Sequence, residues 1–456
     1  MNATSTRRVS VEPGGTQVVA HVGLHALGAF ADRLSLGDLL SSRIAITGER
    51  LPIHDRGKVL VQGMLMLAGG GESCADIEYL RAEDELFGEV PSDSTLYRTF
   101  RKLDPVTLSG VKEAFAEVRG HIWRRSAVTT GMVPVVLDLD ASLLEIHSDN
   151  KEATGPNFKG GFGFHPMFCF ADATGEALSA LLRPGNAGAN SAVDHLQVLD
   201  EAIAQLPCKI VAGHRPGDNE GQVRRQVVAR ADSAGCSAGF VFGCRERNIG
   251  FSMVARSNAQ VHGAISKIVG DEQHWAPALC QDGSVREGAE VAEVTDLVDL
   301  SSWPEGTRLI VRREPLHPGA QQSLFPSFCH RCWGHYTDQP GSPVELDVFM
   351  RAHAHVEDHL CRLKDSGLLR FPFCDLDANR AWLAEVCFTA DLVRWFQLLC
   401  LSGGLACAEP KALRWRLWHA PARIAHSARR TVVRVLDGWP DADAILRAHR
   451  RIALIT

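Results

Sequence analysis

The chain of 456 residues contains no window of eighteen uncharged apolar residues, so the sequence predicts no membrane span. Its first residues, MNATSTRRVSVEPGG, lack the apolar stretch of a secretory signal, and we expect a cytoplasmic location. A disulfide framework is also missing, because the 13 cysteines are odd in number and scattered, as is typical of reduced, mostly buried thiols. The formal net charge of -6 argues mildly against a surface coated with nucleic-acid-binding charge, so any contact with nucleic acid must come from a local basic patch.

Two carboxylates stand in a segment, Val135 to Ser142, that is otherwise mostly valine and leucine. Because side chains alternate along a strand, Asp138, Asp140 and Ser142 share one face of the predicted strand. Carboxylates in an apolar surround are costly unless they pair with a cation or hold a metal. Mg²⁺ or Mn²⁺ is the natural partner for this face.

The first 125 residues have the apolar spacing of helices, with glycines 69 to 71 ending one of them. The segment PSDSTLYRTFRKL, residues 91 to 103, opens with two capping candidates and predicts a helix that carries Arg98, Arg101 and Lys102. Two interpretations remain open for this region. It is either a helix-turn-helix reader of DNA or a helical bundle with a solvated basic face.

From residue 126 the pattern changes to strands. A first strand over 133–146, a glycine-rich hairpin around Lys159, and strands over 166–171 and 177–182 predict an antiparallel meander. A helix over 186–206 and a strand over 226–231 follow, and the last strand ends on Asp232. This order is the one expected of an RNase H-like fold, whose acidic residues gather at strand ends.

Short strands between residues 250 and 340 interrupt the α/β order and predict a β-rich insertion. A helix over 344–364 follows, with one apolar side. Its adjoining face carries Met350, His353, Glu357, Cys361 and Lys364. Glu357 is thus the third acid in the chain that lies next to apolar residues expected in the core.

The C-terminal part begins with an apolar helix over 380–401, whose charged residues exclude a membrane span. Residues 411–436 contain no acidic residue, and their cations are interleaved with Trp415 and Trp418. We expect a basic helical run here that either binds the DNA backbone or packs on the core with extended arginines. Its first candidates for DNA contact are Arg414, Arg416 and Arg423.

Two groups of residues have a weak likeness to zinc sites. Cys329 and Cys332 form a CxxC near His335, but no second CxxC follows at a finger-like distance, and the segment predicts a strand. His355 and His359 flank Glu357 without forming an HExxH motif. We therefore expect no zinc site at either place.

Six blocks of the sequence together resemble a known family. The chain resembles the DDE transposases of bacterial insertion sequences, of the DDE-domain group 1 type, and within them the insertion-sequence family thirteen-eighty. The resemblance is carried, in the family's order, by LDLDASLLEIHS at 137–148, KGGFGFHP at 159–166, LLRPGNAGAN at 181–190, RADS at 230–233, HVEDHLCRLKDSGL at 355–368 and AEPKALRWRLWHAPAR at 408–423.

The resemblance implies an α/β, RNase H-like catalytic core in which three acids bind two divalent ions, Mg²⁺ or Mn²⁺. It assigns the acids to Asp140, Asp232 and Glu357, with Asp138 as the alternative for the first. Related transposases carry a Tyr, Arg, Glu, Lys signature around the last acid. Glu357 and Lys364 match it, whereas Met350 and His353 stand at its Tyr and Arg positions. Lys364 and His353 are thus candidates for contact with DNA phosphate.

The expected organisation has five parts. These are a helical DNA-end-binding region (1–125), the first part of the core (126–249), the β-rich insertion (250–340), the last part of the core (341–402) and a basic helical region (403–456). The implied function is a nucleoid-associated transposase that binds double-stranded DNA at terminal inverted repeats, cleaves and transfers strands, and acts as a homodimer on two ends. The alternatives are a catalytically inactive, transposon-derived DNA-binding protein and a metal-dependent phosphoesterase.

Overall fold

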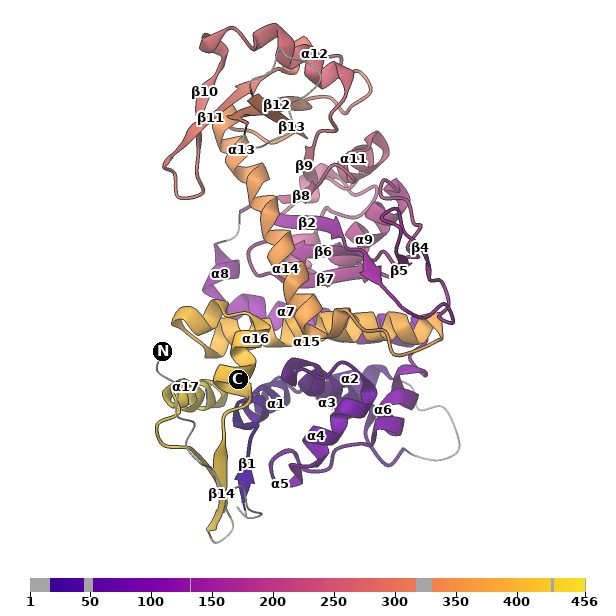
Figure 1. The fold of residues 1–456 in the computed structure, drawn as a ribbon, viewed down its shortest axis with the longest axis vertical. Helices are drawn as coiled ribbons and strands as arrows, with labels where there is room; N and C mark the ends of the chain where they lie inside the picture. The colour runs from indigo at the N-terminus through magenta and orange to yellow at the C-terminus, as the bar shows by residue number, and fades with distance from the viewer. Residues whose placement is uncertain (1–16, 45–51, 132, 317–329, 428–429, 456) are drawn as a thin grey trace, which may run out of the picture.

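The computed structural model describes residues 17–44, 52–131, 133–316, 330–427 and 430–455. Figure 1 shows three layers along the long axis of the molecule. A β-rich part with α12 lies at the top, a sheet flanked by helices lies in the middle, and a helical part lies at the bottom. The long helix α15 crosses between the middle and the bottom.

The central sheet contains five strands in the order β7-β6-β2-β8-β9. Strand β6 runs antiparallel to both of its neighbours, whereas β2, β8 and β9 are parallel. In chain order this is a 3-2-1-4-5 sheet with an antiparallel second strand, which is the topology of the RNase H-like fold predicted above. The strands are β2 (Val135–Ala141), β6 (Met167–Ala171), β7 (Glu176–Leu181), β8 (Val227–Ala231) and β9 (Gly250–Val254).

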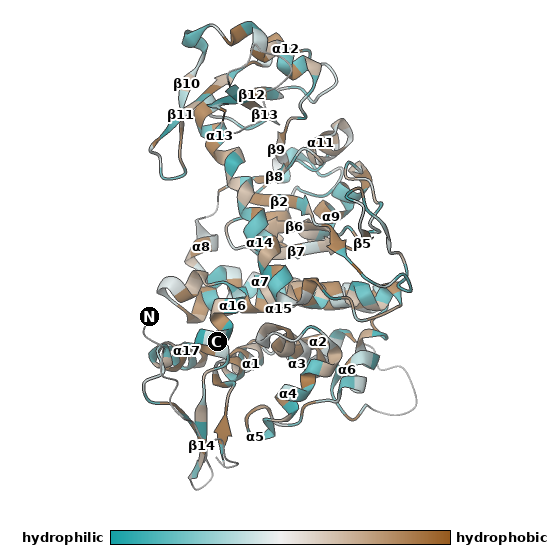
Figure 2. Cartoon of the chain, in the orientation of Figure 1, coloured by the Kyte–Doolittle hydropathy of each residue, from teal (hydrophilic) through white to brown (hydrophobic). Residues whose placement is uncertain are grey.

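The sequence explains why this sheet lies inside the molecule. Strands β6 and β8 are buried at every residue, and β2 is buried except at Val136, Asp140 and Ala141, which are partly exposed. Figure 2 accordingly colours these strands mostly as hydrophobic. Helices α9 (Ala192–Gln205) and α11 (Ala238–Arg245) cover one side, and both begin at serine caps, Ser191 and Ser237.

The β-rich insertion continues the same sheet. Its strands extend it antiparallel through β13, which pairs with β9, to a total of nine strands. Strand β9, which the sequence analysis assigned to the insertion, is therefore the fifth strand of the core. The insertion comprises α12 (Ala259–Ile268), β10 (Ala276–Leu279), β11 (Val285–Glu293), β12 (Arg308–Pro315) and β13 (His330–Thr337).

The predicted helical character of the first 125 residues is confirmed. Ser92 caps α6 by accepting a hydrogen bond from the Thr95 amide, so the segment 91–103 begins its helix as expected. The helices are α1 (Val22–Arg33), α2 (Leu36–Arg43), α3 (Arg56–Gly69), α4 (Glu78–Arg81), α5 (Asp84–Phe87), α6 (Asp93–Phe100), α7 (Pro105–Arg125) and α8 (Ala127–Thr130).

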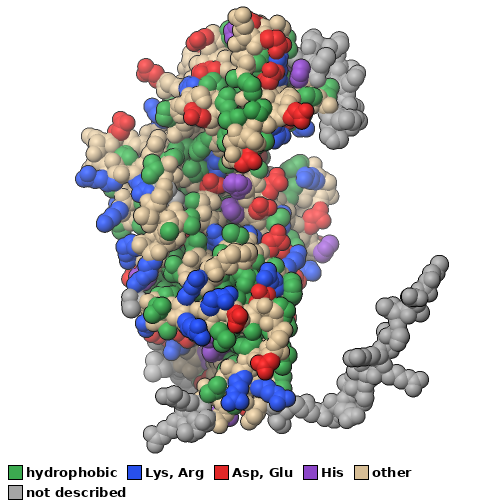
Figure 3. Space-filling model, turned by 90° about the vertical axis from the view of Figure 1, so that its left-hand side faces the viewer, with side chains coloured by type: hydrophobic (Ala, Val, Ile, Leu, Met, Phe, Trp, Pro, Cys, Tyr) green, Lys and Arg blue, Asp and Glu red, His purple; other side chains and the backbone are tan. Residues whose placement is uncertain are grey.

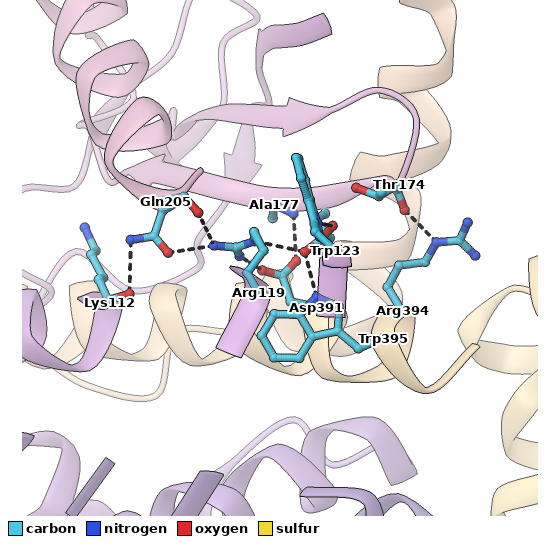
Figure 4. Close-up of polar contacts among 10 residues, drawn as sticks. Lys112, Arg119, Trp123, Thr174, Ala177, Gln205, Asp391, Arg394 and Trp395 are labelled. Atoms are coloured by element: carbon cyan, nitrogen blue, oxygen red, sulfur yellow. Dashed lines mark hydrogen bonds and ion pairs between the residues drawn. The ribbon is translucent and has the colours of Figure 1, made fainter. Parts of the chain in front are cut away.

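Helix α15 (Leu376–Cys400) joins the two halves, because it packs on β7 on one side and on α3 on the other. A buried polar cluster fixes it to the sheet (Figure 4). Arg119 of α7 donates to Glu176 of β7 and Asp391 of α15, and the Trp123 and Trp395 indoles donate to Glu176. No helix in the described ranges is long and apolar enough to cross a membrane.

The predicted helix over 344–364 forms as two consecutive pieces, α13 (Pro343–Arg351) and α14 (His355–Leu363). A tighter turn of 3-10 helix, Ala352–Ala354, joins them, and Figure 1 shows the pair as one column beside the sheet. The α-helix ends at Leu363. Lys364 then opens a π-helical turn that closes with Gly367 at φ +105°.

The helical prediction for the C-terminal region is wrong between residues 422 and 435. These residues form a hairpin of β14 (Ala422–Ser427) and β15 (Arg430–Val435), with β1 (Val18–Val19) beside β14. The reason is a period of two, since Ala422 and Ile424 are buried and Arg423 between them is exposed. Helical segments flank the hairpin, at α16 (Pro410–Leu413), a π-helical turn (Arg414–Trp418) and α17 (Ala442–Ala453).

The predicted glycine-rich hairpin around Lys159 forms a small separate sheet of β3 (Leu144–Glu145), β5 (Phe162–Phe164) and β4 (Gly155–Pro156). Its tip is a tight turn organised by Asn157, whose side-chain oxygen accepts from the amides of Lys159 and Gly161. Gly160 has φ +83° in this turn, a conformation that favours glycine.

Candidate active site

The three predicted acids come from neighbouring elements. Asp140 lies near the end of β2, Asp232 directly follows β8, and Glu357 is in the first turn of α14. Strands β2 and β8 are parallel, and their last registered pair is Leu139 with Ala231. Because the next step along both strands is Asp140 and Asp232, the register brings these two carboxylates to the same edge of the sheet.

The electrostatics of Asp140 indicate that the three carboxylates form one group. Burial raises the pKa of Asp140 to about 6, and the negative charges of Asp232 and Glu357 add to the rise. The amide of Ala141, which donates to Asp140 at 2.7 Å, and the ring of His353 act in the opposite direction. The charges of both other acids therefore act on the pKa of Asp140.

The donor set suits a divalent cation. Within the described part of the chain, no ion pair neutralises Asp140, Asp232 or Glu357, so the site has an excess of negative charge. Hard carboxylate oxygens are the ligands that Mg²⁺ and Mn²⁺ prefer. As the described side chains stand, no three His, Cys, Asp or Glu groups are close enough together to hold one ion. The side chains must therefore draw together to ligate one.

Asp138 has different partners from Asp140, although it shares a face of β2 with it. It is fully buried, and Arg230 of β8 donates to both of its oxygens, at 2.8 and 2.7 Å. His353 donates to it through Nδ1 at 2.8 Å. Burial alone would raise the pKa of Asp138, but the hydrogen bonds from His353 and Arg230 hold it below its usual value. Both oxygens of Asp138 are thus already engaged.

His353 lies inward, against Asp138, with only 8% of the residue exposed. The turn between α13 and α14 directs it at β2 and not at solvent. Met350, at the neighbouring signature position, is also buried, and Ser252 of β9 donates to its sulfur at 3.1 Å. A direct contact of His353 with DNA remains a prediction, and so does that of Lys364, which is partly exposed at the end of α14.

The C-terminal candidates for DNA contact have distinct surroundings. Arg414 is partly buried and donates to backbone carbonyls of Ala68 and Asp365, so it links the C-terminal region to α3 and to the turn after α14. Arg416 forms a two-pronged ion pair with Asp441 at 2.8 and 2.9 Å. Arg423 is exposed on β14, and its register partner on β15 is Arg434.

The described histidines of the two zinc-like groups have other surroundings. Cys329 is outside the described residues, and burial lowers the pKa of His335 on β13 to about 4. His355 donates to Asp172 at 3.0 Å, and His359 faces Phe170 and the β6–β7 turn. The structure therefore offers no support for zinc at these positions.

The sequence analysis missed Arg230 and Asp172. Arg230 is 1% exposed and also pairs with Asp172 at 3.0 Å, which in turn contacts His355 of α14. The sequence does contain a signal for Arg230. It stands two residues before Asp232, and residues two apart in a strand point to the same face of the sheet. No signal in the sequence marks Asp172, since its position depends on the pairing of β6 with β2.

The topology and the grouped carboxylates define the class: this is an RNase H-like protein with an acidic site at the ends of β2 and β8. The chain belongs to the family described as Transposase DDE domain group 1, whose model matches residues 1–456. The chain is also similar to a solved structure described as a cryo-EM structure of the piggyBac transposase synaptic complex with hairpin DNA. That similarity has 9% identity and a TM-score of 0.42, over 83% of this chain and 75% of the other. No curated protein matches the chain.

Proposed function

We propose that this member of the transposase family binds the terminal inverted repeats of its own insertion sequence and catalyses strand cleavage and strand transfer. The observation that carries the proposal is the placement of the acids: the register of β2 and β8 brings Asp140 and Asp232 to one edge of the sheet, and Glu357 lies in the first turn of the helix that contacts β2. Such a group, left without protein cations, is costly unless divalent ions bind it. The family membership supports the same reaction.

In this mechanism Asp140, Asp232 and Glu357 would hold two divalent ions, Mg²⁺ or Mn²⁺. When bound, such ions would supply Lewis acidity for phosphoryl transfer on DNA. The protein residues fix the geometry. Asp140 and Asp232 lie on one rigid sheet edge, and Glu357 approaches from the exposed first turn of α14. The exposure of Glu357 leaves this side open to a DNA strand.

The surface offers a path for the DNA backbone. Figure 3 shows acidic and histidine side chains gathered at mid-height on one face, with Lys and Arg side chains spread below them. A DNA backbone bound on this face would meet these Lys and Arg side chains, and phosphate contacts of this kind position a duplex without reading its sequence. Lys364 and Arg423 are our candidates for such contacts, because both keep their side chains at least partly exposed.

The reaction acts on two transposon ends, and we infer a homodimer in the DNA complex on that ground. A second candidate function follows from the spacing of the acids. Because no three described side chains are close enough to hold an ion, a catalytically inactive DNA-binding protein is the competing account. The two accounts differ in whether the DNA complex cuts its substrate when a divalent ion is supplied.

The deciding experiment is cleavage of labelled DNA that carries the element's own terminal repeats, with Mg²⁺ or Mn²⁺. We expect nicking at the repeat boundary, and its loss in Asp140→Asn, Asp232→Asn and Glu357→Gln, because each removes a ligand charge. Asp358→Asn is the matched control, since Asp358 is an exposed carboxylate beside Glu357. Binding of the repeats without cutting, under either ion, would favour the inactive DNA-binding protein.

A further inference from the structure

A buried set of three residues repeats the layout of the three acids one step deeper in the molecule. Asp138 precedes Asp140 by two residues on β2, and Arg230 precedes Asp232 by two residues at the end of β8. His353 precedes Glu357 by four residues, one helical turn. Each buried residue thus shares a strand face or a helix face with one acid.

We propose that Asp138, Arg230 and His353 form a positioning clamp that sets the mutual placement of Asp140, Asp232 and Glu357 for divalent ions. The inference rests on the proposed function, and it assigns these residues a role in orienting the ligands. They are positioning residues, because they act through the acids.

The first half of the clamp fixes the two strands. Asp138 and Arg230 are direct register partners in the parallel pair β2–β8, and the two-pronged bond joins their side chains across it. A guanidinium and a carboxylate in this geometry restrict rotation as well as distance. A shift of β8 along β2 would break both bonds, so Asp140 and Asp232 are held opposite each other.

The second half fixes the helix to the strands. His353 ties the start of α14 to Asp138, and Arg230 donates to the Phe349 carbonyl near the end of α13 at 2.6 Å. The Arg230 guanidinium also stacks over the Phe349 ring at 4.9 Å. These contacts lie about one turn (His353) and about two turns (Phe349) before Glu357. They therefore decide how far the Glu357 carboxylate stands from the sheet edge.

A second ion pair distinguishes a positioning role from a purely stabilising one. The fold contains another two-pronged pair, in which Arg247 donates to Asp200 at 2.6 and 2.8 Å. That pair joins α9 to the end of α11 and involves no residue of the acidic site. Asp200→Asn is therefore the matched control for a lost two-pronged bond.

The test measures Mn²⁺ binding by the full-length protein with its DNA ends, from the electron paramagnetic resonance signal of free Mn²⁺. The Mn²⁺ concentration for half-maximal cleavage is measured in parallel. We expect Arg230→Lys, which keeps the charge but loses the two-pronged bond, to raise both midpoints about 10- to 100-fold, the usual effect of losing a group that orients a metal ligand. Asp200→Asn should leave both midpoints unchanged.

Two histidine variants separate positioning from direct DNA contact, and both keep the Arg230–Asp138 pair. His353→Asn places an amide nitrogen where Nδ1 stands, so it retains the donor to Asp138 and should stay close to the unaltered protein. His353→Gln places that nitrogen near Nε2 and should behave like Arg230→Lys. The reverse order would overturn the clamp and indicate that Nε2 contacts DNA.

The remaining outcomes are also decisive. If the unaltered protein cuts DNA and the folded clamp variants bind Mn²⁺ with its affinity, the inference is wrong and the proposed function stands. The inference is equally wrong if Asp200→Asn shifts the midpoints as much as Arg230→Lys does. If the unaltered protein neither binds Mn²⁺ nor cuts its ends, the proposed function itself fails, and the clamp with it. Melting temperatures identify variants that lose the fold.

Discussion

The buried cluster between α7, β7 and α15 should lose much of its stability when its shared cation is removed. Arg119 is 1% exposed and is the cation shared by Glu176 and Asp391, both of which are fully buried. Arg119→Met keeps most of the side-chain volume but leaves two carboxylates without their counter-ion. Breaking a buried pair by removing one partner costs about 3–5 kcal/mol of unfolding free energy.

The loss should depend on pH, because one of these carboxylates can take up a proton. The pKa of Asp391 is raised to about 7, chiefly by burial and also by the charge of Glu176, while Arg119 acts against the rise. Because the pKa of Asp391 is raised, the folded chain holds a proton that the unfolded chain releases. The contribution of protonated Asp391 to the free energy of unfolding is therefore fully present at low pH. It declines as the pH rises from about 4 through about 7.

Protonated Asp391 needs no cation, so Arg119→Met should cost less near pH 5.5 than near pH 8. The difference should be at most about 1.4 kcal/mol, because pH 8 lies about one unit above the pKa of Asp391 and one pKa unit corresponds to about 1.4 kcal/mol. Denaturant unfolding at the two pH values measures it. Arg43→Met, which removes a half-exposed pair with Glu113, is the control and should cost no more than about 1 kcal/mol at either pH. Equal losses for Arg119→Met at both pH values would refute the reasoning.

Two further predictions concern other parts of the molecule. Gly23→Ala should destabilise the packing of α1 on the turn Arg414–Trp418, because an added Cβ would lie 2.0 Å from the Leu417 carbonyl oxygen. We expect a cost of about 1–3 kcal/mol, read from denaturant unfolding, with Gly131→Ala as the control in open space. His335→Leu should reduce the loss of stability on acidification. Burial lowers the pKa of His335 to about 4, so the unfolded chain binds the extra proton between 6.5 and 4 and stability falls as the pH falls. Melting temperatures at pH 7.5 and 5 that fall equally in both proteins would contradict this assignment.

Much of the core could be predicted from local patterns. The alternation around Asp140 and the strand that ends on Asp232 indicated the order of strands and helices along the chain, because these signals depend only on residues close in sequence. The partners of Asp138 could not be predicted in this way. Whether Arg230 or a metal ion faces a strand aspartate depends on the register of two strands separated by about ninety residues, which no local period contains.

The C-terminal hairpin is a different case. Here the local sequence does contain the signal for a strand, and the prediction of a helix was wrong. The interleaved cations and tryptophans of residues 411–418 do begin a helical segment, and we extended it across Pro421. A proline disfavours helix in the residue before it, and the alternation of Ala422, Arg423 and Ile424 is that of a strand. Two of the DNA-contact candidates of this region, Arg414 and Arg416, therefore lie in the π-helical turn, whereas Arg423 lies on β14.

The continuous sheet has a consequence for any attempt to make a smaller version of this protein. Deleting the insertion would remove β13 and leave the backbone donors and acceptors of β9 unpaired along its outer edge. An open edge of this kind is a template for association with other chains. A shortened protein would therefore aggregate through β9 unless β13, or a substitute strand, were kept as its cover.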